Sequence, residues 1–394
     1  MSSELDPQAQ PGKAEAPDAV PRDHSISTAT EQKTAYVASQ WTLMWWKFRR
    51  HKLAMAGGIV VILLYLSAVF AEFLAPADPN DVVSTYTYAP PQRLHFWDTS
   101  DGFDLGMYVY GYKSEIDTNT LARTFTLDEE TKIPVRLFAE GIDYKFLGVI
   151  PLNTHLIGPT EAGEPFYLMG ADRLGQDLLS RLIFGTRISM SIGLVGVLLS
   201  LVLGILLGGM SGYFGGWIDN VVQRVIEFLV SIPRIPLWLG LAAAVPKTWS
   251  PLQVYFGITV ILSIIGWTGL ARVVRGRFLS LREEEFVTAA RLDGSGEMRI
   301  ILRHMVPSFM SHIIASLTLA VPGTILAETS LSYLGLGLRS PINSWGVLLQ
   351  EAQNIRSIST APWLLLPGLL VVIAVLALNF LGDGLRDAAD PYAS

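Results

Sequence analysis

Few residue patterns in this 394-residue chain could support catalysis or ligand chemistry. The chain has no cysteine, and its six histidines lack the spacing typical of metal ligands. The phosphate-binding pattern G-x-x-x-x-G-K-[ST] is missing, and the one Gly-Lys pair, Gly12-Lys13, is followed by Ala14. A Ser-His-Asp arrangement cannot be placed either, because the hydroxyl groups fall mostly on packing faces. We therefore expect no catalytic residues, no metal site and no cofactor bound by this chain.

Two charged residues inside apolar segments are candidates for function, because a charge within a membrane span is costly. Glu328 lies in an apolar stretch, where a structural partnership with an arginine or a backbone group is favoured over contact with a solute. Arg234 stands between Pro233 and Pro236. Prolines so placed kink a helix and free its carbonyl groups, which suits a gate. A cytoplasmic-facing arginine on an imperfect span is the equal alternative.

The 275–307 segment is too polar to span a membrane but is patterned like two short helices. Residues 283–285 are all glutamates, which stabilise the start of a helix through its dipole. Residues 293–296, Asp-Gly-Ser-Gly, then break the helix, and a second amphipathic piece continues to Val306-Pro307. Such a protrusion is typical of a docking site. The alternative, a basic loop lying on anionic lipid, would not need this pattern.

The composition indicates an all-α polytopic membrane protein. Half of the residues are hydrophobic and 16% are charged, against about 25% charged in soluble proteins. The apolar residues gather in blocks of about 20, the length that crosses a bilayer as a helix. Six transmembrane helices are predicted, at 53–74, 188–210, 221–245, 254–274, 309–334 and 363–382. An even number of spans places both termini on the same side.

The chain divides into four predicted regions. Residues 1–35 form a disordered tail rich in Ala, Pro, Gln, Glu and Asp, and residues 36–74 combine an aromatic interfacial segment with the first span. Residues 75–185 form a small β-containing insertion with no block apolar enough to span. The core, 186–394, holds the other five spans and the 275–307 segment.

The arginines predict the orientation. The loop between the fourth and fifth spans and its flanks carry Arg272, Arg275, Arg277, Arg282, Arg291, Arg299 and Arg303, whereas the short loops on the other side carry Lys247, Arg339 and Arg356. Positive charge marks the cytoplasmic side. Both termini are thus expected in the cytoplasm, and the insertion in the periplasm or outside the cell.

A ridge of small residues marks the second span as a buried, helix-packing element. Gly196, Ser200, Gly204, Gly208 and Gly212 recur every fourth position and so share one helix face. In lipid, such faces allow two helix backbones to approach closely.

Several motifs resemble those of binding-protein-dependent ABC importer permeases. Residues 286–294 (FVTAARLDG) with 300–307 (IILRHMVP) are similar to the coupling loop of the dipeptide/oligopeptide/nickel permease family, in its second-subunit type. Residues 170–181, 326–337 and 381–391 resemble, in the same order, the segments that open the core, lie in the fifth span and end the chain. The insertion is longer than in most short members of the family.

The resemblance implies a type I ABC importer permease fold and a role as a permease subunit of the bacterial inner membrane. The implied partners are a second permease subunit, two ATPase subunits that bind ATP and Mg, a periplasmic substrate-binding protein and membrane lipid, with no nucleic acid. The residues of this chain that correspond to the family's coupling loop are Glu285, Thr288, Ala289, Ala290, Asp293, Gly294 and Arg299. Thr288 stands where the family has an acidic residue, so that residue's role does not carry over. Glu285 and Asp293 are the candidates to replace it, and the sequence does not show that either does.

Peptides delivered by the binding protein are the implied substrate, with Arg234 and Glu328 as candidate residues of the translocation pathway. Import of oligosaccharides or other small solutes by the same architecture is the nearest alternative. An ion-coupled secondary transporter would carry internal repeats, which we do not find. A membrane-anchored receptor would leave the packed spans and the arginine-rich segment without a purpose.

Overall fold

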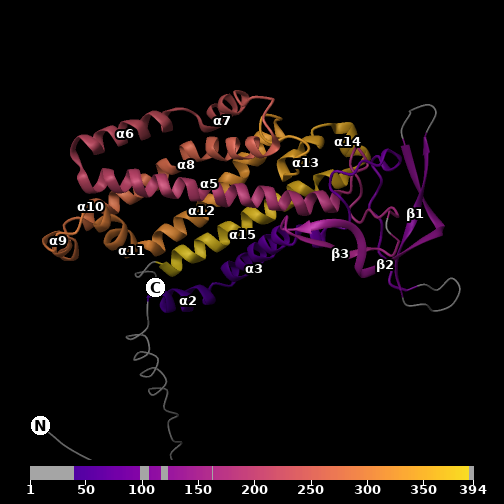
Figure 1. Ribbon diagram of the computed structural model, residues 1–394, viewed down its shortest axis with the longest axis horizontal. Coiled ribbons are helices and arrows are strands. Elements are labelled where there is room, and N and C mark those ends of the chain that lie inside the picture. Colours follow the sequence, from indigo (N-terminus) through magenta and orange to yellow (C-terminus); the bar gives the residue numbers. More distant parts are fainter. Residues whose placement is uncertain (1–39, 98–105, 117–122, 162, 390–394) are drawn as a thin grey trace, which may run out of the picture. The chain divides into compact units, whose positions relative to one another are not determined.

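The computed structural model describes residues 40–97, 106–116, 123–161 and 163–389. The chain forms two units, Met1–Trp46 and Lys47–Ser394, and helix α2 (Gln40–Arg50) contains the boundary between them. The second unit is a bundle of long helices with a three-stranded sheet near one end and the short helix α9 (Glu285–Leu292) at the other (Figure 1). The expected tail, 1–35, lies outside the described residues.

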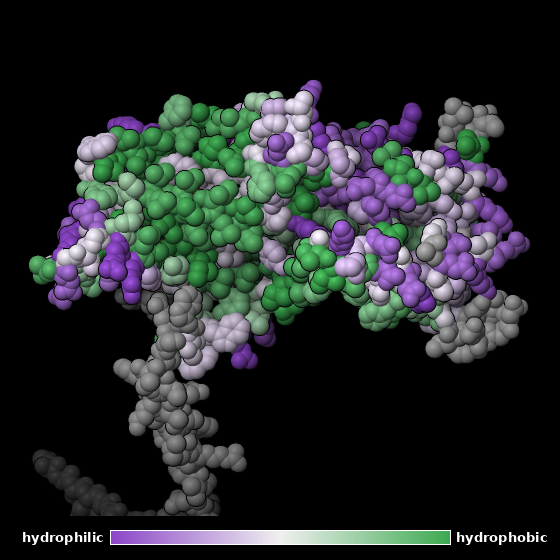
Figure 2. Space-filling view, in the orientation of Figure 1, coloured by the Kyte–Doolittle hydropathy of each residue, from purple (hydrophilic) through white to green (hydrophobic). Residues whose placement is uncertain are grey.

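Five helices of the described chain are long and apolar enough to cross a membrane. They are α3 (Lys52–Val69), α5 (Leu178–Phe214), α8 (Pro251–Leu281), α12 (Met310–Tyr333) and α15 (Leu366–Ala389), the last preceded by the 3-10 turn η3 (Pro362–Leu365). Figure 2 shows apolar side chains covering the helices between two more polar ends. At 1.5 Å per residue, the 37 residues of α5 reach about 55 Å, which is longer than the hydrocarbon core.

The third span is not the continuous helix that 221–245 predicted. It consists of α6 (Gly216–Ser231) and α7 (Arg234–Ala243), which meet at 87°. Ile232, before Pro233, is extended at φ −87° and ψ 130°, because proline disfavours a helical conformation in the residue before it. The kink expected at these prolines is thus confirmed, and six spans result only if the bent pair counts as one.

The small-residue ridge of α5 packs mainly against α8. A Cβ added at Gly208 would lie only 2.4 Å from the Ala271 carbonyl oxygen, and one at Gly212 would lie 2.7 Å from the Arg275 carbonyl oxygen. Further along, Gly204 faces the Leu270 side chain, and Ser200 lies opposite Gly266 of α8. At the start of the ridge Gly196 faces Thr324 of α12. Close approach of the two backbones is what these residue types permit.

The other long helices pack around this pair through similar close contacts. Gly57 of α3 lies against the Ala377 carbonyl of α15, and Gly384 of α15 lies against Ala54 of α3. Gly382 packs on Leu319 of α12. Helix α15 therefore contacts α3 and α12 through backbone positions that a larger side chain would push apart.

The predicted β structure of the insertion is confirmed. Strands β1 (Met107–Ile116), β2 (Arg123–Phe146) and β3 (Ile150–Pro159) form an antiparallel sheet in the order β1-β2-β3. A small core of Val109, Ile133, Val135 and Phe166 holds it. Short elements α4 (Ala71–Leu74), η1 (Ser84–Tyr86), α13 (Trp345–Glu351) and α14 (Ile355–Thr360) complete this end. Helix α5 begins at Leu178, eight residues before the predicted start of the core.

Replacing Gly208 by alanine is expected to destabilise the bundle, because its Cβ would overlap the Ala271 backbone. Gly269→Ala in α8 is the matched control, since a Cβ there meets nothing within 4 Å. We expect a loss of about 1–3 kcal/mol for the first variant, as for other overpacked sites. Thermal unfolding of the purified chain in detergent measures the difference, and equal melting temperatures would contradict the packing described.

Candidate coupling site

Helix α8 extends further than the sequence predicted. The first residues of the 275–307 segment therefore belong to this helix of the bundle. Arg275 and Arg277 lie on α8, which ends at Leu281. The apolar face of the helix continues through the fully buried Val274 and Phe278, whereas the prediction ended the span at residue 274. The part that leaves the bundle begins after Leu281 and returns to it at α12.

The predicted pair of short helices around a glycine turn is confirmed. Helix α9 starts after Glu284 and has Glu285 in its first turn. It ends in a Schellman motif, in which Ser295 N donates to Ala290 O (3.1 Å) and Gly294 N donates to Arg291 O (3.0 Å). Gly294 has φ +75°, the left-handed conformation that only glycine adopts at little cost.

The chain after the turn returns to the bundle through α10 (Glu297–Arg299), a π-helical stretch η2 (Ile300–Met305) and α11 (Val306–Ser308). Val287 and Ala290 of α9 are buried in one core with Ile300, Met305 and Phe278. That core also includes Tyr213 at the end of α5. Helix α9 is thus fixed to α8, η2 and α5 by apolar packing and is not a slack loop.

Four large apolar side chains of this segment are exposed beside its charged residues. Leu292 is 85% exposed, and Phe286, Met298 and Leu302 are between 40% and 48% exposed. We call these four residues the α9 surface. Large apolar side chains exposed at a polar end of a molecule are candidates for contact with another protein.

The predicted coupling residues occupy different positions on this segment. Glu285, Thr288, Ala289 and Arg299 are exposed, whereas Ala290 is buried in the core described above. Asp293 caps the end of α9, and Gly294 forms the turn. The acidic Glu285 and Asp293 flank Thr288 along the chain, and substitution of the family's acidic residue by either of them stays a prediction.

Two polar contacts near this segment were not predicted from the sequence. Arg291 of α9 donates from Nε to Tyr213 Oη (3.1 Å), with its guanidinium 4.9 Å from the centre of the Tyr213 ring. Arg275 of α8 forms two hydrogen bonds of 2.5 and 2.6 Å to Asp219 of α6. Arg291 and Tyr213 are 78 residues apart, so no local spacing could reveal their contact.

The two pathway candidates lie in contrasting surroundings. Glu328 is completely buried, and its carboxylate accepts hydrogen bonds from Ser332 (2.8 Å), Ser344 (2.8 Å) and Ser189 (3.2 Å). This arrangement favours the structural alternative, with hydroxyl groups in place of the arginine or backbone partner that the sequence suggested. Arg234 is exposed at the first position of α7, directly after the 87° bend.

Comparison with known proteins shows the family. Residues 200–393 match the binding-protein-dependent transport system inner membrane component, and residues 39–91 match the N-terminal transmembrane domain of oligopeptide transport permease C. The oligopeptide transport system permease protein OppC of Haemophilus influenzae is 40% identical over 240 residues, which cover 61% of this chain and 74% of that protein. The chain belongs to the binding-protein-dependent ABC importer permeases.

Other relatives cover different shares of this permease. OppC of Escherichia coli K12 is 41% identical over 58% of this chain and 73% of that protein. The di/tripeptide transport system permease DppC of Pseudomonas aeruginosa is 29% identical over 88% of this chain and 90% of that protein. The inward-facing MetNI methionine ABC transporter is similar with a TM-score of 0.41 and 18% identity, over 53% of this chain and 96% of that chain. Family membership and the apolar helices make this a multi-pass membrane permease subunit of an ABC transporter.

Replacing Gly294 by alanine is expected to loosen the turn between α9 and α10. A left-handed conformation costs a non-glycine residue about 1–2 kcal/mol, so amide exchange across 285–299 should accelerate about 5- to 30-fold. Gly296→Ala is the matched control, because Gly296 has φ −64° and a Cβ at either glycine meets nothing within 4 Å. Hydrogen–deuterium exchange on the two permease variants measures the effect, and equal exchange would refute the role of the positive φ.

Proposed function

We propose that this permease translocates di- and oligopeptides, delivered by an external binding protein, in an importer driven by ATP hydrolysis on partner subunits. The α9 surface is the docking site for an ATPase subunit. The observation that carries this proposal is a helix that exposes large apolar side chains, Phe286 and Leu292, and is fixed to the bundle by its buried Val287 and Ala290. Such a helix can receive a push from a partner and pass it to the spans.

The orientation rests on charge. Arginines are concentrated on α9, the end of α8 and the stretch that follows, at Arg275, Arg277, Arg282, Arg291, Arg299 and Arg303. Positive residues flank the cytoplasmic ends of spans, so this end faces the cytoplasm and the sheet faces the periplasm. With six spans, counting α6 and α7 as one, both termini lie in the cytoplasm.

Coupling needs contacts that differ between the inward-open and outward-open states. Movement of α9 acts on α8 and η2 through their shared core with Val287 and Ala290, and on α5 through the contact of Arg291 with Tyr213. Because α5 and α8 touch backbone to backbone, they move together. ATP-driven closure of the two ATPase subunits thereby tilts the spans, and hydrolysis resets them.

The partners divide the remaining tasks. The ATPase subunits bind ATP and Mg, and the binding protein docks at the sheet end. A second permease subunit completes the translocation pathway. Arg234, exposed at the broken span, is the pathway candidate with access to such a partner or to a solute. Glu328 acts on the pathway only by holding α5, α12 and α13 together through its serines.

The substrate class follows from the relatives. The OppC and DppC proteins are named for oligopeptide and di/tripeptide transport. Uptake of a labelled peptide by proteoliposomes that hold the complete transporter, with its binding protein outside, tests the assignment. An oligosaccharide that is imported while peptides are not would overturn it in favour of the nearest alternative.

Leu292→Asp is expected to release the ATPase subunits, because it replaces the most exposed apolar side chain of the α9 surface by a charge. Ile355→Asp is the matched control, since Ile355 is 83% exposed, comparable to Leu292 at 85%, but lies at the sheet end. We expect ATPase subunits to co-purify with the control and to fall at least tenfold with Leu292→Asp. Normal co-purification and uptake in both variants would exclude the α9 surface as the docking site.

Tyr213→Leu is expected to uncouple the motor, since it removes both the ring and the hydroxyl that Arg291 contacts. ATPase subunits should still bind and hydrolyse ATP, while peptide uptake per ATP falls severalfold. Tyr213→Phe keeps the ring under the guanidinium and loses only the hydrogen bond. Its peptide uptake per ATP should therefore lie between those of the wild type and Tyr213→Leu. Unchanged uptake in Tyr213→Leu would show that α9 acts on the bundle by another route.

A further inference from the structure

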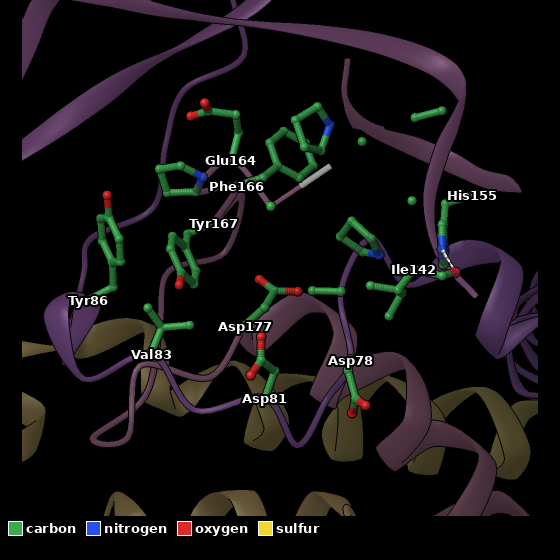
Figure 3. Close-up of a pocket in the computed structure, with 18 of the residues that line it drawn as sticks. Asp78, Asp81, Val83, Tyr86, Ile142, His155, Glu164, Phe166, Tyr167 and Asp177 are labelled. Carbon is green, nitrogen blue, oxygen red and sulfur yellow. Dashed lines mark hydrogen bonds between the residues drawn. The ribbon is translucent and has the colours of Figure 1, made fainter. Parts of the chain in front are cut away.

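A cavity of about 170 Å³ lies at the sheet end, between the sheet, the segment that follows α4 and the start of α5. Figure 3 shows its walls, with Tyr86 and Tyr167 on one side and Ile142 and His155 on the other. Pockets that enclose whole drug-sized ligands measure roughly 300–1,000 Å³. This cavity therefore has the size for one chemical group on a short stem.

The cavity is acidic. Its lining includes the carboxylates of Asp78, Asp81, Glu140, Glu164 and Asp177, and no Lys or Arg among the described residues lines it. Figure 3 shows Asp177 next to Tyr167, with Asp81 on the far side of Asp177. Burial, and then the charge of Asp177, raise the pKa of Tyr167, so the Tyr167 hydroxyl stays neutral. The lining attracts a cation and repels an anion.

Two buried polar atoms in this lining have no hydrogen-bond partner among the described residues. Asp177 is 3% exposed, and its Oδ1 is unpartnered, while its Oδ2 accepts from Ser180 N (2.7 Å) at the start of α5. His155 is 2% exposed, and its Nδ1 is unpartnered. Buried polar atoms are rarely left in this state.

Both unpartnered atoms are acceptors. The carboxylate oxygen of Asp177 has no proton to donate when ionised. His155 Nε2 lies 3.1 Å from the Ile142 carbonyl oxygen, a contact that selects the tautomer with the proton on Nε2 and the lone pair on Nδ1. Burial raises the pKa of Asp177 to about 6, so the carboxylate is mostly ionised at pH 7.5. A matching ligand is positively charged and donates hydrogen bonds.

We propose that this cavity binds a primary ammonium group on a short stem, with Asp177 as its main acceptor. An ammonium has three donors, and the Tyr86, Phe166 and Tyr167 rings cover an apolar stem and favour a cation over their faces. A metal ion fits less well, since the described residues hold no cluster of three His, Cys, Asp or Glu side chains placed for one. The source of the group is a peptide amine or a lysine of a partner protein.

Calorimetric titration of the full chain in detergent at pH 7.5 with n-butylammonium tests the ligand chemistry. We expect saturable binding that 1-butanol does not reproduce and that Asp177→Asn weakens at least tenfold. Asparagine retains the helix-capping oxygen, so this variant should fold. Asp143→Asn is the matched control, an exposed carboxylate of β2 outside the cavity, and should bind like the wild type.

If Asp177→Asn does not fold, Asp81→Asn replaces it, because Asp81 is exposed and caps no helix; we expect at least threefold weaker binding. Absence of saturable binding to the wild type would overturn the proposal. The proposal would also be overturned if the tested Asp177 or Asp81 variant bound n-butylammonium as tightly as the wild type. Saturable binding of Zn²⁺ or Ca²⁺ that prevents binding of the amine would overturn it as well.

The assignment of the amine to a transported peptide rests on the proposed peptide import. A second measurement distinguishes a peptide amine from a lysine of the binding protein. If the group is the N-terminus of the transported peptide, Asp177→Asn slows uptake of a free peptide but not of its N-acetylated form. If it is a lysine of the binding protein, the variant weakens docking of that protein for both peptides. Failure of peptide import altogether would leave the calorimetric result standing, so the two proposals fail separately.

Discussion

The close contact between α5 and α8 is the constraint on which the rest of this structure depends. Gly208 and Gly212 bring the α5 backbone against the carbonyl groups of Ala271 and Arg275. In lipid no hydrophobic force drives helices together, so association depends on close packing and polar contacts. Because small residues recur along the whole contact, α5 is held to α8 over several turns and behaves as one rigid element with it.

Helix α5 links the two surfaces that face water. Asp177 caps its first turn beside the acidic cavity, and Tyr213 in its last turn contacts Arg291 of the coupling segment. Thirty-seven residues separate the two caps of this helix. A helix of that length without an internal proline transmits a tilt from one end to the other, which a broken span such as α6 and α7 cannot do. The proposed coupling therefore relies on the unbroken second span and not on the third, which is interrupted at Pro233.

Two ionisable groups among the helices are satisfied within this chain. Glu328 is surrounded by three serine hydroxyls from α5, α12 and the start of α13, and Asp219 is paired with Arg275. Such groups are costly in an apolar setting unless they are hydrogen-bonded. Among the described residues, Asp177 Oδ1 and His155 Nδ1 at the sheet end have no hydrogen-bond partner, and neither do Trp238 Nε1, Thr329 Oγ1 and Trp345 Nε1 in the bundle. Asp177 and His155 differ from these three because they line the acidic cavity. The contrast separates residues that hold the bundle together from residues placed to receive a ligand.

The sequence by itself determined the features that depend on neighbouring residues. The lengths of the apolar blocks predicted the spans, the proline pair predicted the bend, and the Asp-Gly turn predicted the end of α9, because each follows from local backbone chemistry. Four-residue spacing likewise showed that Gly204 and Gly208 share a face. Only the tertiary structure decided what that face contacts, that Ala290 points inward while Leu292 is exposed, and that Glu328 meets serines. It alone joined Tyr213 to Arg291, and Asp177 to His155 in one cavity, because contacts between distant residues depend on how the helices and the sheet pack in three dimensions.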